Sequence, residues 1–136
     1  MSTWLLDTNI IAYALNDVGS VRTRLNEAAH TGRVLTSIVV VAELMYGVER
    51  STRREANRYR VEHELASLEI APLALGAVGR FGRIKAELRA LGVAKSDLDL
   101  LIAASALDLG ATLVSHDQAL LDGSIPSLVV EDWYSP

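Results

Sequence analysis

The sequence predicts an α/β fold built on a central parallel sheet of about five strands. Short runs of apolar residues alternate along the chain with longer segments in which apolar residues recur at helical spacing. Such uniformly apolar strands are typical of a parallel sheet buried on both faces, with right-handed helical crossovers. A chain of 136 residues, 50% of them hydrophobic, can form a complete core, and no linker-like stretch divides it. We therefore expect a single domain over residues 1–136.

Five short runs are candidate strands, and polar or turn-forming residues follow most of them. They cover residues 4–6, 33–36, 68–71, 111–114 and 127–130. The first run stops at Asp7, and the fourth is followed by Ser115, His116 and Asp117. In a parallel sheet the carboxyl ends of the strands meet at one edge, where ligands bind, so Asp7 and Asp117 could share that edge.

The segments between these runs predict helices with recognisable capping residues. Thr8 and Asn9 could cap a helix that starts at Ile10, and Ser37 could cap a helix over residues 38–50. Further helices are expected at residues 52–68, 75–91 and 97–109. Gly92 and Gly110 follow the last two, and glycine suits the left-handed conformation that often ends a helix.

Four carboxylates lie in or beside apolar segments, where an unpaired charge is costly: Asp7, Glu43, Asp99 and Asp117. Glu43 belongs to a helix that is apolar on nearly every side, and Asp99 shares a helix face with Ile102. A common counter-charge would explain all four, because clustered like charges are stable as anions only around a cation. The chain has no cysteine, so any metal would be held by oxygen or imidazole, and oxygen ligands suit magnesium or manganese.

Each acid also has a purely structural explanation. Asp7 and Asp117 could cap the helices that follow them, and Ser96 with Asp99 resembles a capping box. For Glu43 the alternative is an ion pair with an arginine of the helix at residues 75–91. The arginines of that segment are Arg80, Arg83 and Arg89.

Two stretches are rich in basic residues and could contact a polyanion. The first holds Arg50, Arg53, Arg54, Arg58 and Arg60, and the second holds Arg80, Arg83, Lys85 and Arg89. Alternatively, both are solvated helix faces with short-range pairs to Glu49, Glu55, Glu62 or Glu87. The net charge is −4, and the four clustered acids account for all of it, because the remaining acidic and basic residues are equal in number.

Four blocks of the sequence resemble, in order, the motifs of PIN-domain ribonucleases, and within that family the VapC toxins of bacterial toxin–antitoxin pairs. The blocks are LLDTNII at residues 5–11, a segment from Ser37 that contains AELMYG at residues 42–47, DLLIAA at residues 99–104 and ATLVSHD at residues 111–117. The resemblance runs from Leu5 to about Trp133. It implies a PIN-like α/β/α sandwich around the parallel sheet.

The resemblance also implies roles for the four acids. Asp7, Asp99 and Asp117 would hold a Mg²⁺ or Mn²⁺ ion, and Glu43 would complete the acidic set directly or through water. These four would be the catalytic residues.

Other positions near the motifs have supporting or unrelated roles. Asn9 and Ser115 match polar positions that support the site, although the family often has threonine where Ser115 stands. Asp117 is the least secure of the four acids, because some relatives lack the fourth acid. We interpret Asp97 as a helix-start residue and Asp122 as a solvated loop residue. A role for His116 follows only from its position beside the site.

By this resemblance the protein would be a metal-dependent endoribonuclease, the toxin of a toxin–antitoxin pair, that hydrolyses a structured RNA to 5′-phosphate and 3′-hydroxyl products. It would form a homodimer and bind a cognate antitoxin whose Arg or Lys approaches Asp7, Glu43 and Asp99. No signal sequence or membrane span is evident, so a cytoplasmic protein is expected.

The alternative is a PIN-like module that binds RNA or protein without catalysis. A serine hydrolase is excluded because the chain has no G-x-S-x-G turn. A phosphatase that forms an aspartyl phosphate would have a second aspartate where this chain has Asn9.

Overall fold

The computed structural model describes all 136 residues and contains a five-stranded sheet in the order β3-β2-β1-β4-β5, with every neighbouring pair parallel. The strands are β1 Thr3–Leu6, β2 Arg33–Ser37, β3 Glu69–Ala71, β4 Thr112–Val114 and β5 Val130–Glu131. The central strand β1 pairs Leu5 with Leu35 on one side and with Leu113 on the other, and all three are completely buried. The predicted parallel sheet is therefore confirmed.

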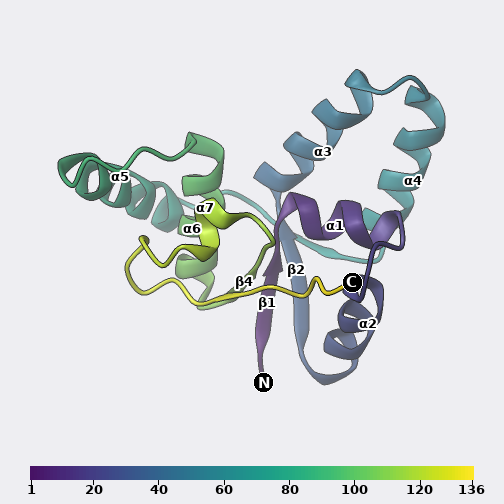
Figure 1. The fold of residues 1–136 in the computed structure, drawn as a ribbon, viewed down its shortest axis with the longest axis horizontal. Coiled ribbons are helices and arrows are strands. Elements are labelled where there is room, and N and C mark those ends of the chain that lie inside the picture. The colour runs from purple at the N-terminus through teal and green to yellow at the C-terminus, as the bar shows by residue number, and fades with distance from the viewer.

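Seven helices surround this sheet (Figure 1). They are α1 Thr8–Leu15, α2 Val21–Thr31, α3 Ile38–Arg50, α4 Arg54–Ala66, α5 Leu75–Ala90, α6 Asp97–Leu109 and α7 Gln118–Leu121. In Figure 1 α1 and α2 lie on one side of the sheet, and α5, α6 and α7 lie on the other. Helix α3 contacts both α1 and α6, so it joins the two sides above the carboxyl ends of the strands.

One connected hydrophobic core contains 29 buried residues. The strands supply completely buried side chains such as Leu6 and Val114, and α6 supplies an uninterrupted buried run from Ile102 to Ala106. This burial explains why the strands have no polar alternation and why α6 has apolar residues all round its middle turns. None of the helices has both the length and the apolar character required to cross a membrane.

Several predicted boundaries were wrong, each for a local reason. Helix α1 starts at Thr8 instead of Ile10, because the Asp7 side chain caps it. The last strand lies at Val130–Glu131 instead of residues 127–130, because Ser127 adopts a left-handed φ of 65° that interrupts an extended chain. Helix α4 starts at Arg54 instead of residue 52.

Two helices were not predicted at all. Helix α2 carries a visible signal, since Val21, Leu25 and Ala28 recur at helical spacing and are all buried. Helix α7 is a single turn of four residues, too short for periodicity to reveal. The predicted end of α6 at Leu109 is confirmed, with Gly110 directly after it at φ 64°. Helix α5 ends at Ala90, one residue before the predicted end, and Gly92 follows its C-cap Leu91 at φ 75°.

Candidate functional site

Asp7 lies at the carboxyl end of the central strand and is only 4% exposed. Its Oδ1 atom accepts a hydrogen bond of 2.8 Å from the backbone N–H of Thr8, so it caps α1. The backbone N–H of Asp7 donates to the carbonyl oxygen of Val114 at 2.9 Å, which ties it to β4. Asp7 therefore caps a helix and also lies buried at the edge of the sheet where a ligand would bind.

A continuous chain of hydrogen bonds links three of the four acids. The Thr8 hydroxyl donates to Glu43 Oε1 at 2.7 Å, while the Thr8 backbone N–H donates to Asp7. On the other side, the Ser115 hydroxyl donates to Asp7 Oδ2 at 2.7 Å. The Asp117 backbone N–H donates to Ser115 Oγ at 3.0 Å. Elements far apart in the sequence are thus brought together around Asp7.

Asp99 joins this group through its charge and makes no hydrogen bond to the other acids. It lies in the first turn of α6, where its N–H donates to Ser96 Oγ at 3.1 Å, as the capping alternative predicted. Partial burial raises the pKa of Asp99, and the charges of Asp117 and Glu43 add to that rise. Asp99 therefore lies close enough to both carboxylates to interact with them.

Burial is the main cause of the most perturbed acid in the site. It raises the pKa of Asp7 from 3.8 to about 6, and the neighbouring charges of Asp99 and Glu43 raise it further. The hydrogen bonds from Ser115 and Thr8 act in the opposite direction, because they stabilise the ionised form. The four predicted acids consequently form one interacting group, named here the acidic cluster.

Asp117 and Glu43 complete the acidic cluster from its two sides. Asp117 Oδ1 accepts a 3.0 Å hydrogen bond from the backbone N–H of Ala119 and so caps α7. Glu43 is half-buried on α3, with Thr8 as its hydrogen-bond partner. The predicted alternative for Glu43 was wrong, because no ion pair involves it.

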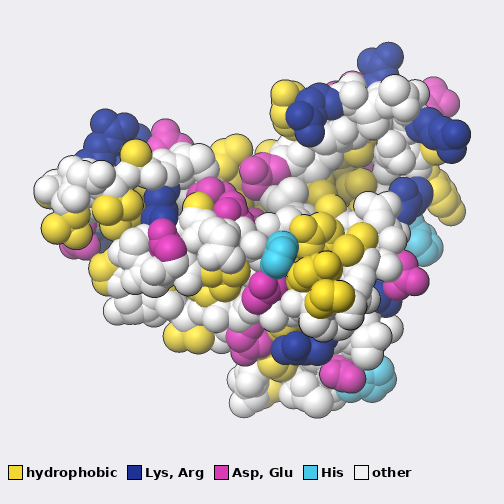
Figure 2. Space-filling model, in the orientation of Figure 1, with side chains coloured by type: hydrophobic (Ala, Val, Ile, Leu, Met, Phe, Trp, Pro, Cys, Tyr) yellow, Lys and Arg dark blue, Asp and Glu magenta, His cyan; other side chains and the backbone are white.

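One face of the molecule is hollowed. Figure 2 shows the hollow between two projecting parts of the molecule, named here the arms, which Figure 1 identifies as the α3–α4 pair and α5. Acidic side chains gather at the base of the hollow, and Lys and Arg side chains occupy the outer parts of both arms. The arrangement is an acidic floor between basic rims.

The basic residues of the arms divide into paired and unpaired groups. Arg54 and Arg58 both pair with Glu49, while Arg80 pairs with Asp108 and Lys85 with Asp97. No ion pair forms with Glu55, Glu62 or Glu87, so that part of the solvated-face alternative was wrong. Five arginines of the arms have no acidic partner: Arg50, Arg53, Arg60, Arg83 and Arg89.

Asn9 and Ser115 lie where they can support the acidic cluster. Ser115 is completely buried between Asp7 and Asp117, and it donates to one and accepts from the other. Asn9 Oδ1 accepts a 3.2 Å hydrogen bond from the backbone N–H of His116, which holds the loop after β4 against α1.

Asp97 and Asp122 lie outside the acidic cluster, as expected. Asp97 is exposed in the first turn of α6. Asp122 is more than a solvated loop residue, because it accepts a 2.8 Å contact from the Lys95 ammonium, and this contact holds its pKa well below the usual range.

Sequence reasoning missed two residues of the site, Thr8 and Lys95. Thr8 was assigned only a capping role, yet it bridges Asp7 and Glu43. The Lys95 side chain is only 4% exposed, and its charge lowers the pKa of Asp99. Nothing in the sequence marks Lys95, because its neighbours in space come from the α7 region.

The acidic cluster has the donor chemistry of a site for a hard divalent cation. All of its ligating atoms are oxygens, and each Asp7 oxygen accepts only one hydrogen bond, which leaves a lone pair free. As the side chains stand, no three acidic or histidine groups are close enough together to enclose a metal ion.

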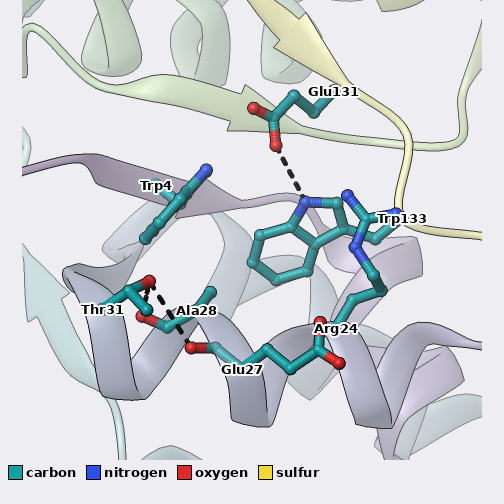
Figure 3. A pocket seen from close by; sticks show the side chains of 7 residues that line it. All are labelled: Trp4, Arg24, Glu27, Ala28, Thr31, Glu131 and Trp133. Atoms are coloured by element: carbon teal, nitrogen blue, oxygen red, sulfur yellow. Dashed lines mark hydrogen bonds between the residues drawn. The ribbon is translucent and has the colours of Figure 1, made fainter.

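A separate pocket of about 260 Å³ lies toward the opposite end of β1 (Figure 3). Trp4, Arg24 and Trp133 line it, and the two indole rings meet edge to face at 6.0 Å. Trp133 Nε1 donates to Glu131 Oε1 at 3.0 Å. No residue of the acidic cluster lines this pocket, and its contacts anchor the C-terminal segment to α2 and β1.

Comparison with known proteins identifies the family. The family model of the PIN domain matches residues 4–123. The chain is 34% identical over 131 residues to ribonuclease VapC2 of Rickettsia felis, an alignment that covers 96% of this chain and 97% of that protein. It is 31% identical over 134 residues to a Salmonella typhimurium protein named tRNA(fMet)-specific endonuclease VapC, with coverage of 98% and 99%.

The fold agrees with a solved structure from the same group. The crystal structure of VapBC2 from Rickettsia felis, bound to a DNA fragment from their promoter, matches with a TM-score of 0.89 and 33% sequence identity. The match covers 96% of this chain and 98% of that chain. The chain therefore belongs to the PIN-domain family and, within it, to the VapC ribonucleases.

Proposed function

We propose that this protein is a divalent-metal-dependent endoribonuclease, the toxin of a toxin–antitoxin pair, and that the acidic cluster is its catalytic site. The observation that carries the proposal is the convergence of Asp7, Glu43, Asp99 and Asp117 at one edge of the sheet. Open parallel sheets bind their ligands at this edge. The acids are held by hydroxyl and backbone donors and not by structural arginines.

Asp7, Asp99 and Asp117 would hold a Mg²⁺ or Mn²⁺ ion, with Glu43 as a further ligand directly or through water. When bound, such an ion acidifies coordinated water and stabilises negative charge on a phosphate. Thr8 and Ser115 orient Asp7 and Glu43 by the hydrogen bonds described above. Water adds to phosphorus as the bond to O3′ breaks and O3′ takes a proton, which leaves 5′-phosphate and 3′-hydroxyl ends.

The unpaired arginines of the arms support an RNA substrate that lies across the hollow. Phosphate neutralisation by such cations supplies most of the sequence-independent affinity for nucleic acid. The name of the Salmonella relative, a tRNA(fMet)-specific endonuclease, supports a structured RNA such as a tRNA as the substrate. We place this activity in the cytoplasm, where such RNAs are found.

A non-catalytic RNA- or protein-binding module is the second candidate function. Such a module would gain nothing from a cluster of carboxylates in which the burial of Asp7 and Asp99 costs stability. The names ribonuclease and endonuclease among the relatives also favour catalysis.

A cognate antitoxin is the proposed protein partner. The Rickettsia felis neighbour was solved as a VapBC pair, which supports a paired protein here. A guanidinium or ammonium group of that partner would complement the acidic cluster, because a cation in this position replaces the counter-charge of the metal. An antitoxin segment that reaches the floor of the hollow would prevent the binding of both RNA and metal.

A homodimer is also proposed. Both arms carry exposed apolar side chains, including Tyr46 at 64% on α3 and Leu75 at 89% on α5. Met45, the neighbour of Tyr46 in α3, is partly buried against the core and adds little to such a patch. Exposed apolar patches on small soluble domains often mark interfaces between copies.

Replacing Asp7 by Asn should reduce cleavage of a tRNA pool by at least about 100-fold, because the cluster loses one of its charges. EDTA should abolish cleavage by the wild-type protein, and Mg²⁺ or Mn²⁺ should restore it. The matched control is Asp97→Asn, an exposed acid outside the cluster, which should retain activity. Gel analysis of 5′-labelled RNA gives the rates; undiminished cleavage in EDTA by protein free of contaminating nuclease would refute the metal requirement.

The metal-free protein should lose stability as the pH rises from about 4 to 7. The pKa of the Asp7 carboxyl is 3.8 when the chain is unfolded and about 6 when it is folded. Between these values the folded state binds a proton that the unfolded state has released, so stability falls as the pH rises, and the loss is complete above the folded pKa. The shift corresponds to about 3 kcal/mol. Urea unfolding in EDTA should show Asp7→Asn gaining stability relative to the wild type across this range.

Added Mn²⁺ at pH 7 should raise the Tm of the wild type and not that of Asp7→Asn.

For the pH experiment, parallel curves of stability against pH for the wild type and Asp7→Asn from pH 4 to 7 would mean that burial of the Asp7 carboxylate does not destabilise the folded state.

Expression of the protein alone should arrest growth and degrade cellular RNA, whereas Asp7→Ala should be harmless and co-expression of the neighbouring antitoxin gene should restore growth. Normal growth and intact RNA with the wild-type protein, together with a folded purified protein that binds Mn²⁺, would contradict the toxin assignment. Growth curves and total RNA gels make the measurement.

Light scattering of the purified protein should give a mass about twice the 14.7 kDa of one chain. A mass of one chain across a wide concentration range would contradict the homodimer.

A further inference from the structure

Three aromatic rings gather beside the acidic cluster. Tyr13 from α1, His116 from the loop after β4 and Tyr134 from the C-terminal segment contact one another with tilted rings. The ring centroids are 5.8 Å apart for Tyr13 and His116, 5.6 Å for the two tyrosines and 4.7 Å for His116 and Tyr134. We name this group the aromatic platform.

Asp132 and the C-terminal segment hold the aromatic platform in place. Asp132 Oδ2 lies 2.7 Å from His116 Nδ1, and its Oδ1 accepts the backbone N–H of Tyr134 at 3.0 Å. The segment itself is fastened to the start of α2, because Ser20 Oγ donates to the Trp133 carbonyl at 2.7 Å. The rings are therefore fixed before any ligand arrives, which lowers the entropy cost of binding on them.

The platform presents both an aromatic face and a free polar atom to solvent. The carboxylate of Asp132 can only accept, so Nδ1 of His116 carries the hydrogen of their bond. No group of the chain bonds Nε2, and no buried side-chain nitrogen or oxygen lacks a partner, so Nε2 is open to solvent. The His116 side chain is 35% exposed.

The backbone joins the platform directly to the acidic cluster. His116 stands between Ser115 and Asp117, and its N–H bonds to Asn9 two residues after Asp7. An RNA strand whose phosphate lies over the cluster therefore has an adjoining base within reach of the platform. The Asp132 carboxylate beside His116 repels a phosphate, so the neutral base is the part of the nucleotide that fits here.

We propose that the Tyr13–His116–Tyr134 platform stacks a base of the RNA substrate next to the cleaved phosphodiester, with His116 Nε2 as a single polar contact to that base. This rests on the proposed ribonuclease function. Every base has a π face, so stacking supplies affinity and register for any sequence, and the one polar contact adds a preference among bases. His116 is thus a positioning residue that binds substrate and takes no part in the bond-breaking step.

Steady-state cleavage of a short RNA separates positioning from chemistry. His116→Ala should raise KM by about tenfold and change kcat by less than about threefold, in line with the effect of removing one stacking side chain. His116→Phe keeps an aromatic face and should restore most of the wild-type KM. His30→Ala, an exposed histidine on α2, is the matched control and should leave KM unchanged.

A binding measurement does not depend on cleavage. The proteins compared all carry Asp7→Asn and differ only at position 116. RNA with 2-aminopurine near the cleavage position should lose fluorescence on binding to the protein that keeps His116 and to the His116→Phe variant. It should keep its fluorescence on binding to the His116→Ala variant. A wild-type KM and undiminished quenching for His116→Ala, with unchanged Tm, would overturn the platform and leave the ribonuclease function standing. Failure of the wild type to cleave any RNA would refute the ribonuclease function, while the quenching would still test the platform.

Discussion

The burial of carboxylates at one edge of the sheet, with their mutual repulsion added to it, is the constraint around which this molecule is organised. Asp7 carries most of that cost, because it is both the most buried of the four and adjacent to Asp99 and Glu43. The fold offsets part of the cost with donors from Thr8 and Ser115, and with the amino-terminal ends of α1 and α6, whose partial positive charge faces the acids. The remainder leaves a site that a hard cation stabilises.

Structural and functional roles coincide in the same side chains. Asp7 and Asp117 each cap a helix, and each also contributes a carboxylate to the cluster. A cap fixes the side chain next to a helix terminus, and a helix that begins at the carboxyl end of a strand points its terminus at the site. Capping is therefore the means by which the fold positions the acids, and it does not compete with a catalytic role.

The two arms determine what can reach the acidic cluster. Lys and Arg side chains lie on the outer parts of the arms, away from the acidic side chains at the base of the hollow, so these positive and negative charges remain separate. The basic rims attract a polyanion, and this attraction brings a phosphate to the acidic floor, which would otherwise repel it. The aromatic platform lies at the side of that floor and adds the contact that phosphate attraction lacks, which is recognition of a base.

The sequence by itself determined the parallel α/β architecture, four of the five strands and most of the helices, and it marked the four acids as site candidates, with Asn9 and Ser115 added by the motif resemblance. These features follow from local patterns, because apolar runs, capping residues and motif spacing are written in neighbouring residues. The tertiary structure alone decided the partners of those acids. It paired Glu43 with Thr8, placed Lys95 near Asp99, and assembled the platform from residues 13, 116 and 134. Contacts of this kind depend on how distant segments pack, and a single sequence carries no local signal for them.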